Sequence, residues 1–170
     1  MGALFFVKHK PTCREIDIVK LTIYTDYSLR VLLYLASKPD ATATITEITE
    51  YYNISRNHLV KVVHNLGIHE FIITSRGKNG GIRLARPAED ILLSDVVRKT
   101  EPDMDLLECF NPKTDNCVIS PNCRLKSMLY EGRSAFMAVL EKNTLADAAR
   151  PIAQTKSAGT VRVNITELKR

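Results

Sequence analysis

Apolar residues recur with the spacing of an amphipathic α-helix from about residue 21 onward, whereas residues 1–19 show no clear period. The first periodic segment predicts a helix over about residues 25–37, with Thr25 as its cap. A second helix is predicted to begin at Thr46, because its hydroxyl lies ahead of a carboxylate within the first helical turn. The folded region is therefore expected to open with two short helices.

A helix-turn-helix pattern continues from these two segments. The second helix is predicted to stop near Asn53, a residue type that tolerates the left-handed backbone of a tight turn. Ser55 is then expected to cap a third helix from Arg56 to about Gly67, where apolar residues repeat at positions i, i+3, i+4 and i+7. A short helix, a three-residue turn and a second capped helix are typical of a DNA-reading helix-turn-helix.

A glycine-rich hairpin is predicted directly after the third helix. Two runs of β-forming residues, 71–74 and 82–85, flank a segment with three glycines in the five positions 77–81. Such a density of glycine is typical of a hairpin tip that needs positive φ angles. With a further short helix over residues 94–99, residues 20–100 predict a winged helix-turn-helix domain.

A longer helix is predicted from residue 124 to about residue 141, followed by a return segment to residue 150. Its apolar side chains form a stripe on one face, and the stripe consists of Leu125, Met128, Leu129, Phe136, Val139 and Leu140. We expect this stripe to be buried against a second copy of the chain. The fold class is therefore mainly α, a winged helix-turn-helix domain plus a long C-terminal dimerisation helix in a homodimer, with residues 151–170 as a flexible tail.

Positive charge is concentrated on the proposed DNA-reading segment. Residues 56–86 hold six Lys and Arg against one Glu, so this segment carries a net charge of +5, equal to that of the whole chain. Phosphate contacts supply most of the affinity for DNA, and polar side chains near a helix front reach base edges. The residues predicted to contact double-stranded DNA are Ser55, Arg56, Asn57, His58, Lys61, Arg76, Lys78, Asn79 and Arg83.

Cysteines are concentrated in a second segment. No apolar run approaches the roughly 20 residues of a membrane span, so we expect a cytoplasmic protein with no membrane partner and with reduced thiols. Cys109, Cys117 and Cys123 lie in a proline-punctuated loop over residues 101–123, with Cys123 at the front of the long helix. The spacing lacks the paired knuckles of a zinc ribbon. Soft thiolates at irregular spacing favour an iron–sulfur cluster, whose fourth ligand must come from elsewhere.

Four blocks of sequence carry a family resemblance: KLTIYTDYSLR at 20–30, SRNHLVKVV at 55–63, RGKNGGIRL at 76–84 and TLAD at 144–147. They resemble the nitric-oxide-sensitive repressors, a branch of the Rrf-type winged helix-turn-helix regulators. The resemblance covers about residues 20–150 and implies a homodimer that reads a palindromic operator. It also implies repression of nitric-oxide detoxification genes and release of the operator when nitric oxide reacts with the cluster.

The resemblance also implies a set of metal ligands. It suggests a [4Fe-4S] or [2Fe-2S] cluster on the three loop cysteines, with Asp26 of the other subunit as the fourth ligand. A related branch, which regulates cluster biogenesis, places a histidine three residues after the last cysteine. This chain has Lys126 at that position and departs from that branch.

Some alternatives stay open at this point. Members of the family usually begin where Val19 stands, so residues 1–18 are expected to be an extension upstream of a natural start. The same cysteines would also suit a thiol-redox switch, a zinc-dependent regulator or a cluster-biogenesis and stress regulator. A cysteine-based enzyme is disfavoured, because the four histidines offer no motif that pairs a base with a nucleophile.

Overall fold

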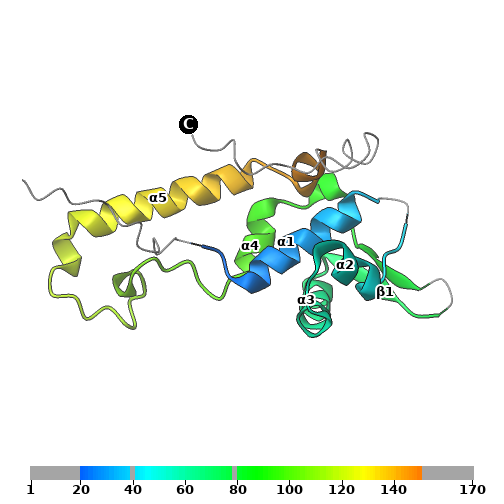
Figure 1. Ribbon diagram of the computed structural model, residues 1–170. Coiled ribbons are helices and arrows are strands. Elements are labelled where there is room, and N and C mark those ends of the chain that lie inside the picture. Colours follow the sequence, from blue (N-terminus) through cyan, green and yellow to red (C-terminus); the bar gives the residue numbers. More distant parts are fainter. Residues whose placement is uncertain (1–19, 39–40, 78–79, 151–170) are drawn as a thin grey trace, which may run out of the picture.

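The structure is a computed structural model in which residues 20–38, 41–77 and 80–150 are described. Helices α1 to α4 and a two-stranded sheet pack together, and helix α5 extends away from them (Figure 1). The predicted mainly α fold with a winged helix-turn-helix domain and a long C-terminal helix is confirmed. The expected N-terminal extension, Val19 included, and the expected 151–170 tail lie outside the described residues.

Helix α1, Ile23–Ala36, begins two residues earlier than predicted. Thr22 has an extended backbone and its hydroxyl accepts a hydrogen bond from the Thr25 N–H at 3.3 Å, so Thr22 is the cap. Thr25 lies inside the first turn and is completely buried. The prediction of Thr25 as the cap is therefore wrong, because the hydroxyl three residues earlier was already placed to accept that bond.

Helix α2, Ile45–Tyr52, is also capped two residues earlier than predicted. The Thr44 hydroxyl accepts from the Glu47 N–H at 3.1 Å, and the Glu47 carboxylate accepts from the Thr44 N–H at 3.4 Å. This reciprocal capping box satisfies two amides that the helix leaves free, so the prediction of Thr46 as the cap is wrong. The prediction for Asn53 is confirmed, since it ends the helix in the left-handed conformation with φ 53°.

Helix α3, Arg56–Ile68, matches its predicted range. It leads into a two-stranded hairpin over residues 72–84, which we call the wing. Strand β1, Ile72–Ser75, pairs antiparallel with β2, Gly81–Leu84, each shifted by one residue from the prediction. The pairing extends past the strands, because the Ala85 N–H donates to the Phe71 carbonyl at 3.0 Å. Ala43 exchanges two backbone hydrogen bonds with Ile82 of β2. The segment before α2 is thus paired with the edge of β2 that does not face β1.

The wing turn uses its glycines for two different reasons. Gly77 has φ +105°, which confirms the predicted need for a positive φ angle. Gly80 has no such φ, but a Cβ at this position would lie 2.4 Å from the Ser75 carbonyl oxygen. The hairpin therefore needs glycine once for backbone rotation and once for close approach.

Helix α4, Leu93–Thr100, leads into the cysteine-bearing segment, and α5, Arg124–Glu141, has the predicted range. Three single turns of 3₁₀ helix, η1 to η3, complete the elements, at Ala88–Asp90, Glu108–Phe110 and Ser120–Asn122. After α5 the chain returns to the domain, where the Leu145 N–H donates to the Ile91 carbonyl at 2.8 Å. The Leu145 side chain is completely buried in the core.

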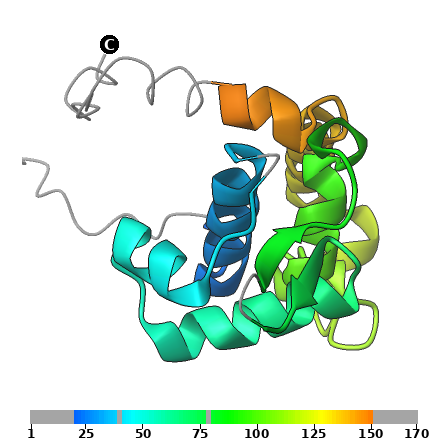
Figure 2. The same cartoon turned by 90° about the vertical axis from the view of Figure 1, so that its right-hand side faces the viewer.

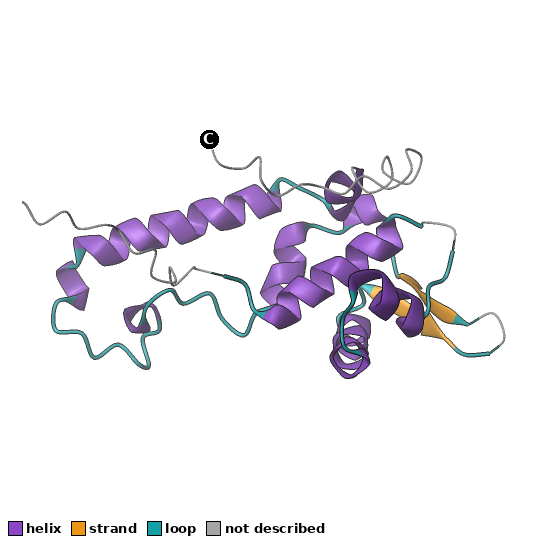
Figure 3. Ribbon diagram, viewed as in Figure 1, coloured by secondary structure: helices purple, strands orange, loops and turns teal. Residues whose placement is uncertain are grey.

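Helix α1 stands at the centre of the packed part and contacts α2, α3, α4 and β2 (Figure 2). Its buried Val31, Leu32 and Leu35 join apolar side chains from all of these elements in one core. The wing and the far end of α5 lie at opposite ends of the molecule (Figure 3). None of the helices within the described residues combines the length and apolarity that crossing a membrane requires.

Candidate functional site

The exposed side of α3 carries the residues predicted to read DNA. Leu59, Val62, Val63 and Leu66 are buried on the inner side, and the outer side exposes Arg56, Asn57, His58 and Lys61. We call these four residues, together with Arg76 and Arg83 of the wing, the reading face. Ser55 is exposed at the N-cap position, but its side chain makes no capping hydrogen bond, so that part of its prediction is wrong.

Helices α1 and α2 fix the orientation of the reading face. The Arg56 guanidinium donates to the Thr46 hydroxyl on α2 at 2.9 Å. The Tyr24 hydroxyl on α1 donates to the Lys61 carbonyl at 3.3 Å, and the Tyr27 ring lies 6.2 Å from the His58 ring, centre to centre. A displacement of α1 would therefore shift α3 through these two contacts.

The wing adds positive charge beside α3. Arg76, directly after β1, and Arg83, within β2, are both exposed. The predicted contacts of Lys78 and Asn79 lie outside the described residues. Helix and wing together present a cationic surface of the kind that phosphate binding requires.

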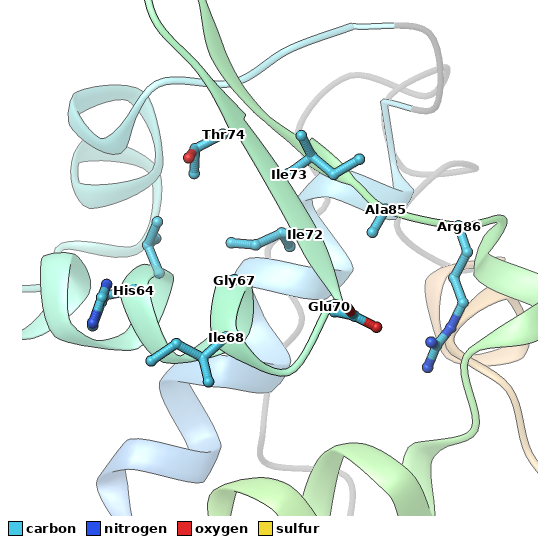
Figure 4. Close-up of a pocket in the computed structure, with 10 residues that line it drawn as sticks. His64, Gly67, Ile68, Glu70, Ile72, Ile73, Thr74, Ala85 and Arg86 are labelled. Atoms are coloured by element: carbon cyan, nitrogen blue, oxygen red, sulfur yellow. The ribbon is translucent and has the colours of Figure 1, made fainter.

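A groove of about 750 Å³ separates the C-terminal half of α3 from β1 (Figure 4). Its lining is mainly apolar and includes Ile72 and Ile73 of the strand, and His64 and Arg86 lie at its two ends. No cysteine lines it. The groove belongs to the helix and wing, and the thiols lie elsewhere in the fold.

Residues 101–123, the thiol loop, connect α4 to α5 and place Cys109, Cys117 and Cys123 outside the packed core. All three thiols are free, Cys117 is exposed and the other two are half-buried. Cys123 is the N-cap of α5, as predicted, and its sulfur accepts a hydrogen bond from the Lys126 N–H at 3.4 Å. The sulfur thus meets one of the N–H groups that the start of α5 leaves without a partner inside the helix.

Asp115 organises the loop between Cys117 and Cys123. Its carboxylate accepts hydrogen bonds from the Ser120 hydroxyl and from the Cys117 N–H, the latter at 3.1 Å, and it pairs with the Lys126 ammonium at 3.1 Å. The Ser120 hydroxyl, and after it Lys126, hold the pKa of the Asp115 carboxyl below its ordinary value. Lys126, three residues after Cys123, therefore holds the loop to the start of α5 through Asp115 and Ser120.

Asp26 lies in the first turn of α1 and pairs with Arg30 through both carboxylate oxygens, at 2.9 and 2.7 Å. Within the described ranges, no three Cys, His, Asp or Glu side chains come together around a single metal position. The chemistry of the donor set nevertheless fits a thiolate-held cluster, because three free thiols share one exposed loop. Such a cluster would draw the loop together and take its fourth ligand from outside it.

The start of the thiol loop is bonded to the start of α1. Both the Thr22 N–H and the Thr22 hydroxyl donate to the Glu101 carboxylate, at 2.7 and 3.1 Å. Thr22 caps the helix that carries Asp26 and Tyr24. Sequence reasoning missed Glu101, Asp115 and the clamping role of Lys126, since lone polar residues in a loop give no periodic signal.

Helix α5 has no buried residue, although much of one face is apolar. Leu125, Met128, Phe136 and Val139 are each more than two-fifths exposed, whereas Leu129 and Leu140 are half-buried. An apolar stripe of this kind on a protruding helix is a candidate interface between protein chains.

Comparison with known proteins places the chain in a family. The model of the Rrf2 family, described as "Iron-dependent Transcriptional regulator", matches residues 21–151. The HTH-type transcriptional regulator NsrR of Halalkalibacterium halodurans is 49% identical over 76% of this chain and 89% of its own length. NsrR of Bacillus subtilis strain 168 is 50% identical over 78% of this chain and 91% of its own length.

Solved structures agree with this assignment. CymR, the global cysteine regulator of B. subtilis, superposes with a TM-score of 0.64 at 22% identity, covering 79% of this chain and 98% of its own. T. potens IscR also gives a TM-score of 0.64 at 22% identity, covering 85% and 93%. The oxidized form of Staphylococcus aureus CymR gives 0.61 at 27% identity, covering 76% and 95%. These relatives are named as regulators, so the expectation that the chain is not an enzyme is confirmed. The chain belongs to the Rrf2 family of transcriptional regulators.

Proposed function

We propose that this regulator is a cytoplasmic, homodimeric repressor that senses nitric oxide through an iron–sulfur cluster and releases the operators of nitric-oxide detoxification genes. The observation that carries the proposal is the position of three free thiols in one loop that is bonded to α1, the helix that contacts the reading helix. The iron dependence in the family description and the similarity to NsrR support it.

The reading face would bind a palindromic operator. Arg56, Asn57 and His58 lie at the front of α3, where side chains of a recognition helix reach base edges in the major groove. Lys61, Arg76 and Arg83 are placed to contact phosphates. In a homodimer, two such faces would meet half-sites one helical turn apart.

Cys109, Cys117 and Cys123 would hold the cluster, of the [4Fe-4S] or [2Fe-2S] type, with Asp26 of the second subunit as the fourth ligand. When bound, the cluster supplies iron atoms with which nitric oxide reacts. Asp26 must leave its pairing with Arg30 to act as a ligand. Because both partners of this pair are substantially exposed, exchanging it costs little.

The remaining residues link the loop to DNA. Glu101 at the start of the thiol loop accepts two hydrogen bonds from Thr22, so a shift of the loop would move the start of α1. Tyr24 on that helix donates to the backbone of α3 at Lys61. Ligation by Asp26 would act on the same turn of α1, and the position of the reading face would then depend on the loop.

The α5 stripe would supply the dimer contact. Its members are Leu125, Met128, Leu129, Phe136, Val139 and Leu140. Burying them against a second copy would gain about 25 cal/mol per Å² of apolar surface, which one chain alone leaves in water. Dimerisation would also bring a second α1 into reach of each thiol loop.

Anaerobic purification tests the sensor. Iron and sulfide are measured, and the visible absorbance is recorded before and after addition of a nitric oxide donor. We expect iron and sulfide in the dimer, and an absorbance spectrum that changes with nitric oxide. A colourless dimer without iron under strict exclusion of air would refute the proposal.

Thiol oxidation is the second candidate, because Cys117 is free and exposed. A redox switch would need no iron and would respond to peroxide in a way that dithiothreitol reverses. Zinc bound in place of iron would appear in the same metal analysis. An iron–sulfur sensor, a thiol-redox switch and a zinc-dependent regulator therefore differ in metal content and in their response to nitric oxide and peroxide.

A further inference from the structure

Arg133, in the third turn of α5, holds the first half of the thiol loop. Its guanidinium lies 4.9 Å from the centre of the Phe110 ring and 4.5 Å from the centre of the Tyr130 ring. It also pairs with the Asp105 carboxylate at 3.3 Å. One side chain thus contacts two separate points of the loop and one point of its own helix.

These contacts lie next to a thiol. Phe110 directly follows Cys109, and both belong to the single 3₁₀ turn η2. The Phe110 N–H donates to the Leu107 carbonyl at 3.0 Å, which holds the backbone of the turn that carries both residues. Holding the Phe110 ring against α5 therefore restricts where the Cys109 sulfur can lie.

The other two cysteines are each connected to α5 by contacts of a different kind. Cys123 is the cap of α5, and Cys117 is tied to Lys126 through Asp115. Cys109 is the most distant of the three from α5 along the chain, and no hydrogen bond of its thiol is seen in the described residues. Its position relative to α5 depends on its neighbour Phe110, whose ring contacts the Arg133 guanidinium and lies 6.0 Å from the Tyr130 ring, centre to centre.

We propose that Arg133 is a positioning residue for Cys109, which sets the distance of this thiol from the other two before any group binds. The proposal deepens, and for its functional meaning rests on, the proposed role of the loop as a cluster site. Planarity is central to it, because a guanidinium can lie against two neighbouring rings while it pairs with a carboxylate, and an ammonium is a compact charge without that extended face.

The test measures alkylation of each cysteine in metal-free, reduced full-length protein by iodoacetamide, resolved by peptide mass spectrometry. In Arg133→Gln, Cys109 is expected to react about two- to fivefold faster, the factor that loss of one partly exposed cation–π contact gives. Cys123 is expected to react as in the unsubstituted protein. Phe110→Leu should reproduce the effect without touching the Asp105 pair, and Arg133→Lys should recover part of the original rate.

Arg98→Gln is the matched control, because it removes an ion pair that α5 makes through Glu141, the last residue of the helix and the one farthest along it from Cys123. Equal acceleration of all three thiols, a lowered melting temperature in proportion, or no change at Cys109 would each overturn the positioning role. A second measurement follows iron loss to a chelator, which should be faster in Arg133→Gln than in Arg98→Gln. If the unsubstituted protein holds no iron, the proposed sensor fails, while the alkylation result still decides the role of Arg133.

Discussion

Residues 20–100 bury a continuous apolar core, whereas residues 101–144 contribute no buried side chain within the described part of the chain. The first region is held by side chains such as Leu32, Leu59 and Leu66, all completely buried. The second is held by ion pairs, of Lys126 with Asp115 and of Arg133 with Asp105. Both regions have regular structure, but only the first is stabilised by its own apolar packing.

This difference separates the two halves of the proposed function. A rigid packed domain keeps a reading face in one shape, which sequence-specific contacts require. The loop is held by a few partly exposed ion pairs and hydrogen bonds, each of which contributes little free energy, so ligand binding can rearrange it. On the proposed function, a rigid DNA-binding domain is therefore attached to a sensing loop that is held less firmly.

The largest effect is expected from the core. Leu66→Ala should lower the free energy of unfolding by about 2–5 kcal/mol, because it leaves a cavity in a packed interior. Val139→Ala in α5 is the comparison, since its side chain is 60% exposed. In dilute solution it should change stability by less than about 0.5 kcal/mol. Urea denaturation measures both, and equal losses would show that α5 is packed within one chain.

The next effect concerns association. Phe136→Ala should weaken the dimer by about 1–3 kcal/mol, the value of burying a large apolar side chain at an interface. Sedimentation velocity over a concentration series gives the dissociation constant. Ser134→Ala on the same helix serves as the control. An unchanged dissociation constant for Phe136→Ala would show that this face of α5 is not part of the dimer interface.

DNA binding should show a smaller effect that depends on salt. Arg83→Gln should weaken operator binding by about 1 kcal/mol and reduce the slope of log K against log salt by about 1, because one phosphate contact is lost. Fluorescence anisotropy at several salt concentrations measures both quantities. Glu89→Gln, an exposed change outside the reading face, is the control. A slope that stays constant would mean that Arg83 does not contact phosphate.

The smallest effect is a pH dependence at α2. Hydrogen bonds from Lys38, and after it Tyr34, lower the pKa of Glu47 from its ordinary value near 4.5. Because the folded-state pKa lies below the unfolded one, the stabilisation is present above about pH 4.5 and disappears as the pH falls through the folded value. Glu47→Gln keeps the capping box, so thermal unfolding should show a loss below about 1 kcal/mol at pH 7 that vanishes in acid. A loss independent of pH would assign it to the cap.

The sequence predicted the packed region and α5 better than the loop, for a physical reason. Burial imposes a period on apolar residues, which gave α3 its range, and the apolar stripe of α5 has the same period although none of its residues is buried within one chain. The caps were misplaced, since Thr22 and Thr25, or Thr44 and Thr46, differ only in local backbone geometry. Contacts such as Glu101 with Thr22 join residues 79 positions apart. Long-range polar contacts of this kind leave no pattern in a single sequence.

The central claim is that a cluster bound by the thiol loop controls the affinity of the winged domain for operator DNA. Anaerobic titration of operator DNA with the dimer, before and after nitric oxide and in parallel with Cys117→Ala, tests it most directly. The account predicts tight binding only for the untreated, unsubstituted protein, and weakened binding in the other two samples. Equal affinity in all three would contradict it.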